Sequence, residues 1–456
     1  MARSKAVLGD ARRDKRAAWM LDRIVSSGSL VLREIGETRS GEVGAHRLLA
    51  SDDVDPDGLL LPHVARTVEA CRGRRIVAAQ DTTEINFARS RQPIAGLGPT
   101  GNTGIRGFFM HPVVAVDADE EALLGVVGAR IWTRAEEPTP DHRGIPFAAK
   151  ESRRWLDAAE IAATRLAPVA SQVVVVADRE GDIYPLFSRR PESIDLVVRA
   201  THDRRLIDKG KLFAAAASWP VLGTAAVTVA PRGAGDKGRT ATVAIKAGSV
   251  TIKRPKTTPS RDEVPALSLG LVEVREIVPT GKRGKAARQP LLWRLVTTLS
   301  VATLAQAQDV VRLYRLRWRI EEVFRVLKSD GLKIEESQLE SVARLLNLAA
   351  LGLVAAARII QLVDARDGSP RPATDVIEAR DIPAAAAVSA ALEGHTERQK
   401  NPHMPGSLAW LAWIAARLGG WNCYYRPPGP KTMARGLDRL LERIEGFRAG
   451  NQRRNV

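Results

Sequence analysis

The sequence predicts an α/β fold: a mixed β-sheet flanked by helices, with an inserted antiparallel β-domain and helical N- and C-terminal domains. The segment SQVVVVADREGD holds four consecutive valines, which is typical of a strand buried between helices on both faces of a sheet. Residues 200–300 contain short alternating apolar stretches between Gly- and Pro-bearing basic loops, which favours antiparallel strands. Residues 1–70 look helical, and the C-terminal part of the chain carries apolar residues at helical spacing.

Composition shifts divide the 456 residues into three expected domains. Residues 1–70 are expected to form a helical N-terminal domain, with Asp10 capping its first helix. Residues 71–368 are expected to form the α/β domain, with the β-rich insertion at about 200–300. A segment with three prolines then marks the boundary to a helical C-terminal domain, residues 369–456.

The elements of the α/β domain are expected in a definite order. Strands at 75–80, 109–116 and 123–131 form a three-strand meander, and a helix follows at 150–166. The valine-rich strand and a short strand at 195–199 complete this part of the sheet. A long apolar helix is expected at 336–363. In the C-terminal domain, helices are expected at 407–418 and 432–447.

The chain is strongly basic, with 69 Lys and Arg against 52 Asp and Glu and a net charge of +17. This excess favours a polyanionic partner such as nucleic acid, although a ribosomal or membrane-surface protein would share it. Cys71 and Cys423 lie far apart in the sequence, so neither a disulfide framework nor a cysteine zinc site is expected.

The expected location is the cytoplasm, with association to the nucleoid when the protein binds DNA. The N-terminus lacks the apolar core of a signal peptide. The most apolar stretch, residues 345–357, is shorter than the roughly 20 residues that a membrane span needs. It is expected to be a buried helix, and no membrane partner is expected.

The segment YRLRWRIEEVFRVLK, residues 314–328, predicts one amphipathic helix. At roughly 100° per residue, Tyr314, Arg317, Glu321 and Lys328 fall within a stripe of about 60°. A carboxylate beside two cations and a phenol is suited to hold a metal and the phosphates next to it. The alternative is a solvated, salt-bridged helix face.

Three acidic residues lie where such chemistry needs them. Asp81 follows the strand RIVAAQ, Asp178 ends the valine-rich strand, and Glu321 lies on the central helix. Two-metal phosphoryl transfer requires carboxylates that hold two divalent cations roughly 4 Å apart, and oxygen ligands favour Mg²⁺ or Mn²⁺. An Asp at a strand end is often only a helix cap, but Asp182 is the better candidate for that role. Zinc hydrolysis and P-loop nucleotide hydrolysis are poorly supported, because the sequence has neither an HExxH nor a P-loop motif.

At these residues the chain resembles the DDE transposases of the insertion-sequence-four family. The resemblance covers nearly the whole chain. It is carried by DTT at residues 81–83, VVVVADREGDIYPLF around Asp178, LVVR ending at Arg199, and the signature Tyr314, Arg317, Glu321 and Lys328.

The resemblance implies a ribonuclease-H-like catalytic domain between a DNA-binding N-terminal domain and a dimerising C-terminal domain. It implies cut-and-paste transposition through nicking, hairpin formation, hairpin opening and strand transfer into target DNA. Asp81, Asp178 and Glu321 would be the catalytic, metal-binding triad, with two Mg²⁺ or Mn²⁺ ions per active site. The implied partners are double-stranded transposon-end and target DNA and a second copy of the chain in a homodimeric synaptic complex.

The resemblance also implies DNA contacts by Tyr314, Arg317, Lys328, Arg199 and Trp293. The family tryptophan that Trp293 matches is associated with handling a flipped base during hairpin formation, whereas the alternative is a tryptophan that packs the sheet.

Two segments depart from the family pattern. Residues 201–203 interrupt the basic run that follows VVR, and Phe108 and Phe109 stand where the family example has paired tryptophans. Two other functions stay open: a DNA-binding regulator that inhibits transposition without cutting, and a ribonuclease-H-like nuclease without strand transfer.

Overall fold

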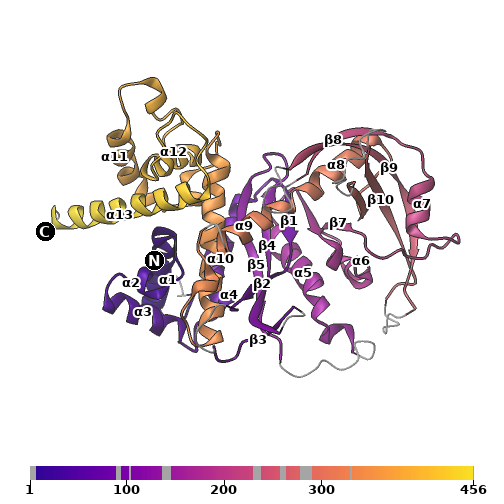
Figure 1. Cartoon of the computed structure of the whole chain (residues 1–456), viewed down its shortest axis with the longest axis horizontal. Helices are drawn as coiled ribbons and strands as arrows, with labels where there is room; N and C mark the ends of the chain where they lie inside the picture. The colour runs from indigo at the N-terminus through magenta and orange to yellow at the C-terminus, as the bar shows by residue number, and fades with distance from the viewer. Residues whose placement is uncertain are drawn as a thin grey trace, which may run out of the picture. The chain divides into compact units, whose positions relative to one another are not determined.

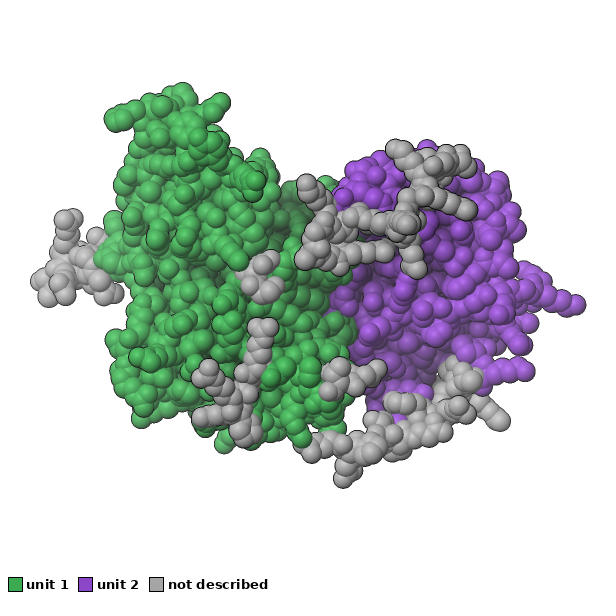
Figure 2. Space-filling view, in the orientation of Figure 1, with its two compact units in different colours: residues 1–74, 82–138, 318–456 green, residues 75–81, 139–317 purple. Residues whose placement is uncertain are grey.

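The computed structural model describes residues 7–88, 94–101, 104–135, 145–229, 238–256, 263–277, 290–328 and 331–454. Large parts of the basic loops expected in the insertion, at 230–237, 257–262 and 278–289, lie outside these residues. The chain divides into two compact units (Figure 2). Unit 1 comprises residues 1–74, 82–138 and 318–456, and unit 2 comprises residues 75–81 and 139–317.

Unit 2 contains a mixed β-sheet, as expected. Its strand order is β1-β6-β7-β11-β10-β9-β8. The strands β1 (Arg75–Gln80), β6 (Gln172–Ala177) and β7 (Asp195–Arg199) are parallel. All four valines of β6 are buried, which confirms the expectation of a strand covered on both faces.

The other strands of unit 2 are antiparallel, as the alternating sequence predicted. They are β8 (Gly223–Val229), β9 (Arg239–Lys253), β10 (Ala266–Glu276) and β11 (Leu292–Thr297). Because β11 pairs with β7, these strands continue the sheet of the parallel strands. The separate inserted domain stays a prediction.

The helices of unit 2 include the expected one after residue 150. They are α5 (Arg154–Leu166), α6 (Tyr184–Arg189), α7 (Leu212–Ser218) and α8 (Leu304–Arg315). Short 3-10 helices accompany them in the described part of the unit: η1 (Phe147–Ala149), η2 (Glu151–Arg153) and η3 (Arg179–Gly181). Thr303 forms a capping box with Gln306 at the start of α8, which explains the sharp beginning of that helix.

The strands of unit 1 pair around β4. The expected strands at 109–116 and 123–131 are present as β4 (Ile105–Asp117) and β5 (Leu123–Trp132), which pair antiparallel. The sequence did not predict β2 (Thr83–Asn86) and β3 (Gly98–Thr100), which both pair with β4. These strands have four and three residues, too short for a period-of-two pattern to identify them.

Helices at both ends of the chain belong to unit 1. Asp10 caps α1 as expected, because its side chain accepts the backbone N–H of Arg12. The N-terminal helices are α1 (Ala11–Ser27), α2 (Leu32–Gly36), α3 (Arg39–Leu49) and α4 (Pro56–Ala70). The later helices are α9 (Trp318–Lys328), α10 (Val342–Ala365), α11 (Ile382–Leu392), α12 (Leu408–Leu418) and α13 (Pro430–Arg454).

Helix α10 is the core helix of unit 1. Its length and composition alone would allow it to cross a membrane, but 83% of its apolar window is buried inside the structure. Helices α1, α4, α9 and α12 and strand β5 pack against it (Figure 1). The buried Asn347 amide donates to the backbone carbonyls of Leu49 and Val54. The buried helix expected at 345–357 is therefore confirmed.

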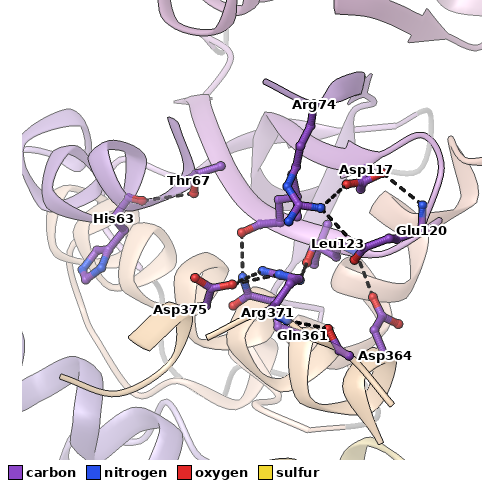
Figure 3. Close-up of polar contacts among 12 residues, drawn as sticks. His63, Thr67, Arg74, Asp117, Glu120, Leu123, Gln361, Asp364, Arg371 and Asp375 are labelled. Carbon is purple, nitrogen blue, oxygen red and sulfur yellow. Dashed lines mark hydrogen bonds and ion pairs between the residues drawn. The ribbon is translucent and has the colours of Figure 1, made fainter. Parts of the chain in front are cut away.

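A polar network joins α10, the β4–β5 turn and the segment after α10 (Figure 3). The Arg371 guanidinium donates to the Asp375 carboxylate at 2.8 Å and to the Leu123 carbonyl at 2.8 Å. Asp364 accepts the backbone N–H of Leu123 at 2.8 Å. Arg74 bridges Asp117 and Glu120 nearby, so the turn is held from two sides.

The thiol of Cys71 is buried beside this network. Burial raises the pKa of Cys71 to about 12, against the opposing effect of Arg371 and Arg74. A thiolate is the reactive form of cysteine, so a buried thiol with a high pKa is inert.

We expect a thiol reagent at pH 8 to modify Cys423 in the folded protein and to leave Cys71 unmodified. Cys423 is half-exposed, whereas Cys71 is fully buried. Mass spectrometry of the labelled protein should therefore show one modified cysteine, and two after denaturation. If Cys71 in the native protein were labelled as fast as Cys423, its burial at the C-terminal end of α4 would be contradicted.

Candidate functional site

Asp81 and Asp178 lie side by side at the carboxyl edge of the unit 2 sheet. Strands β1 and β6 are parallel and in register, with Ala79 opposite Val176. Asp81 lies two residues after Ala79, and Asp178 lies two residues after Val176. Each aspartate is the first residue after its strand. Because paired strands lie about 5 Å apart, the two carboxylates come from neighbouring backbone positions.

Arg199 extends the same row by one strand. Strands β6 and β7 are parallel with Ala177 opposite Val198, so Arg199 lies next to Asp178 in the register. The Arg199 guanidinium donates to the Leu292 carbonyl at 3.2 Å. Burial lowers the pKa of Arg199 from its ordinary value, and the nearby phenol of Tyr314 acts in the opposite direction. The row therefore combines two carboxylates with one partly desolvated cation.

Arg317 pairs with Asp81 through an ion pair between its Nη1 and Oδ2 of the aspartate. The Arg317 residue is 6% exposed, so its charge is largely removed from water. A buried charge needs a partner, and Asp81 supplies it. This contact brings together two of the predicted site residues that are 236 positions apart in sequence.

The prediction of a single helix over residues 314–328 is wrong. Helix α8 ends at Arg315, and α9 begins at Trp318. The backbone N–H groups of Leu316 and Arg317 bond to carbonyls three residues earlier, which ends the α-helical ladder. The predicted common stripe of four polar residues therefore does not exist. Nothing in the local sequence marks the break, since no Gly or Pro occurs there.

Tyr314, at the end of α8, is buried against Trp293. Their rings meet edge to face with centroids 5.3 Å apart. Burial raises the pKa of Tyr314 above its ordinary value, while Arg317 and Arg199 act in the opposite direction. The phenol thus stays protonated beside the two arginines, where it offers a hydrogen-bond donor to an anion.

Trp293 lies on β11 opposite Val274 and is 5% exposed. We expect Trp293→Ala to lower the free energy of unfolding by about 3 to 5 kcal/mol. Trp293→Phe keeps a ring against Tyr314 and should lose less than half as much. Urea unfolding of the three proteins measures the difference, and an Ala variant as stable as the parent would contradict the packing role.

Glu321 and Lys328 both lie on α9 in unit 1. Helix α9 is anchored by Arg319, whose guanidinium contacts the carboxylates of Asp364 at 2.5 Å and Glu322 at 2.6 Å. Burial lowers the pKa of Lys328, and Glu335 acts in the opposite direction. The anchoring fixes the part of α9 that carries Glu321.

Asp182 has a different role from the expected helix cap. It is Asp178 that caps η3, by accepting the Glu180 N–H at 2.8 Å. Asp182 instead forms a buried ion pair with Arg204 at 2.6 Å and accepts the backbone N–H groups of Thr201 and His202. Sequence reasoning missed this pair, although Asp182 and Arg204 both lie in segments singled out for other reasons.

A comparison with known protein families bears directly on this site. Residues 148–358 match the family model described as the transposase DDE domain. This match supports a DDE transposase. It indicates a DNA-cleaving enzyme family, and transposase function implies DNA binding. Asp178, Arg199, Trp293 and the segment 314–328 lie inside the matched residues, and Asp81 precedes them.

DDE transposases generally use divalent metal ions. Asp81 and Asp178 offer hard carboxylate oxygens from adjacent positions, a donor set that suits Mg²⁺ or Mn²⁺. Within the described part of the chain, no group of three His, Cys, Asp or Glu side chains is clustered for metal binding. The carboxylates of Asp81 and Asp178 therefore fit a divalent cation by their chemistry and require a further ligand to complete a site.

Proposed function

We propose that this chain is a cut-and-paste DNA transposase of the insertion-sequence-four family, resembling the transposase of transposon five. It nicks DNA to free a 3′-hydroxyl, forms and opens a hairpin, and inserts the element into target DNA. The observation that carries the proposal is the match of residues 148–358 to the transposase DDE domain. The row formed by Asp81, Asp178 and Arg199 supports it.

The proposal assigns metal binding to Asp81, Asp178 and Glu321, with two Mg²⁺ or Mn²⁺ ions per active site. Such cations activate the attacking oxygen and stabilise the leaving oxygen of a phosphoryl transfer. Asp81 would exchange its ion pair with Arg317 for the cation.

The proposal assigns DNA contacts to Arg199, Arg317, Tyr314 and Lys328, which hold phosphates by charge-assisted hydrogen bonds. Trp293 receives a flipped base, which requires its ring to leave the contact with Tyr314. In this proposal the scissile phosphate binds at the carboxyl edge of the unit 2 sheet, beside Asp81, Asp178 and Arg199.

The proposed partners follow from the same function. Residues 1–70 bind the double-stranded inverted repeats at the transposon ends, and residues 369–456 form the homodimer of the synaptic complex. The protein acts in the cytoplasm, associated with the nucleoid when it is bound to DNA.

We expect the purified chain to cut labelled DNA from the ends of its own element in Mg²⁺ or Mn²⁺ and to stop when EDTA is added. A gel that resolves nicked, hairpin and joined products follows each step. Products joined to target DNA distinguish a transposase from a nuclease without strand transfer, and any cleavage excludes a non-cutting regulator. Unchanged cutting in EDTA would contradict the metal-dependent chemistry.

A further inference from the structure

A basic pocket of about 1080 Å³ lies in unit 2, lined by the segment around Lys150, the start of α6, residues 204–206 and 209–211, and residues 253–256 at the end of β9. Five basic side chains at this pocket make no ion pair or side-chain hydrogen bond with the other described residues. They are Lys150, Arg205, Lys209, Lys253 and Lys256. The basic pocket therefore gathers positive charge that the described chain does not neutralise.

The two carboxylates at the basic pocket are already used. Asp182 is paired with Arg204 and has a fully buried side chain. Glu263 is bound by Ser188 and Arg189, and its side chain is 1% exposed. Because both carboxylates are buried and already bound by other side chains, neither offsets the charge of the five basic side chains.

One of the five basic residues, Lys209, has an unfavourable backbone conformation. Lys209 has φ 62° in the turn before Gly210, a left-handed conformation that lysine rarely adopts. The turn is closed by the Leu206 N–H bonding to the Gly210 carbonyl at 3.1 Å. Next to it, the Lys253 N–H bonds to the Arg205 carbonyl at 2.8 Å. Strained residues that the surrounding structure enforces are often functional.

We propose that the basic pocket binds a run of phosphate groups. Phosphates suit it because they carry several charges in a short length, and Arg205 can donate two parallel hydrogen bonds to one of them. The run belongs either to a free polyphosphate, such as a nucleoside triphosphate, or to the backbone of one DNA strand. Only the second source rests on the proposed function.

The test uses inorganic tripolyphosphate and isothermal titration calorimetry on the full chain. The variant Arg205→Gln/Lys253→Gln removes two charges from the basic pocket. The control Arg426→Gln/Lys431→Gln removes an Arg and a Lys from exposed positions of unit 1. We expect the pocket variant to weaken tripolyphosphate binding about tenfold or more, and the control to bind as the parent does. Equal affinity in all three proteins overturns the proposal, as does equal weakening in both variants.

A second variant distinguishes a loss of phosphate binding from a loss of folding. Lys209→Gly relieves the left-handed strain, so it should be at least as stable as the parent and yet bind tripolyphosphate more weakly. A Lys209→Gly protein that binds with unchanged affinity contradicts a phosphate contact at this turn.

A short single-stranded oligonucleotide distinguishes the two sources. If the oligonucleotide competes with tripolyphosphate and the pocket variant weakens both, the site accepts phosphates of either source. If only the oligonucleotide binds, and only the pocket variant weakens it, the source is a DNA strand. A parent chain that binds tripolyphosphate in the basic pocket but never cuts DNA leaves this proposal standing and rejects the proposed function.

Discussion

Asp178→Ala is expected to abolish DNA cleavage while leaving the binding of transposon-end DNA largely intact. Asp178 lies between Asp81 and Arg199 in the row across β1, β6 and β7, and its loss removes one of the three carboxylates of the proposed metal site. Metal catalysis supplies several kcal/mol of transition-state stabilisation, which corresponds to a rate loss of about 1000-fold or more. Affinity for DNA comes mostly from cations that neutralise phosphates, and the substitution removes none of them.

Gel-based cleavage and electrophoretic mobility shift assays on the same protein preparation measure the two effects separately. Asp208→Ala is the matched control, because Asp208 is exposed and lies in the same unit. Glu321→Ala should behave as Asp178→Ala does. An active Glu321→Ala protein would remove Glu321 from the triad.

At the third carboxylate, Asp81→Asn is preferable to Asp81→Ala, because the amide oxygen can still accept a hydrogen bond from the buried Arg317. Loss of cleavage by the Asn variant then reports on chemistry and not on unfolding. Retention of full activity would mean that Asp81 is only the ion-pair partner of Arg317.

Asp182→Ala is expected to lower the free energy of unfolding by about 3 to 5 kcal/mol, the range for breaking a buried ion pair by removing one partner. The substitution leaves the guanidinium of Arg204 buried without its carboxylate. It also deprives the backbone N–H groups of Thr201 and His202 of their acceptor. Asp178→Ala, four residues earlier, loses one hydrogen bond from Glu180 and should cost far less.

Urea unfolding followed by circular dichroism gives the two free energies under the same conditions. The double variant Asp182→Leu/Arg204→Met provides a second check, since it should recover the part of the stability that Asp182→Ala loses by leaving Arg204 buried and unpaired. If Asp182→Ala unfolds at the same urea concentration as the parent, the ion pair does not stabilise the fold.

The parallel part of the site was predictable because its signals are local. A run of four valines between polar residues indicates a strand buried on both faces, and an acidic residue at the end of such a strand lies at the carboxyl edge of the sheet. Asp81 and Asp178 could therefore be placed on strand ends, and β1 and β6 confirm those positions.

The region around α8 and α9 shows where sequence periodicity misled the prediction. Apolar spacing from residue 314 to residue 328 is compatible with one continuous helix, and no helix-breaking residue interrupts it. The structure ends α8 at Arg315 and places Arg317 in an ion pair with Asp81. Periodicity cannot register such a break, because the partner of Arg317 is distant in the sequence.

The sequence by itself determined the α/β class, the buried valine-rich strand and the chemical types of the site residues. Only the tertiary structure decided which charges neutralise one another. Asp178 and Asp182 are both aspartates of one short motif, yet Asp182 is buried with Arg204 and Asp178 lies beside Asp81 at the sheet edge. The physical reason is that a charge removed from water requires a partner in space, and strand pairing sets the partners while local sequence does not.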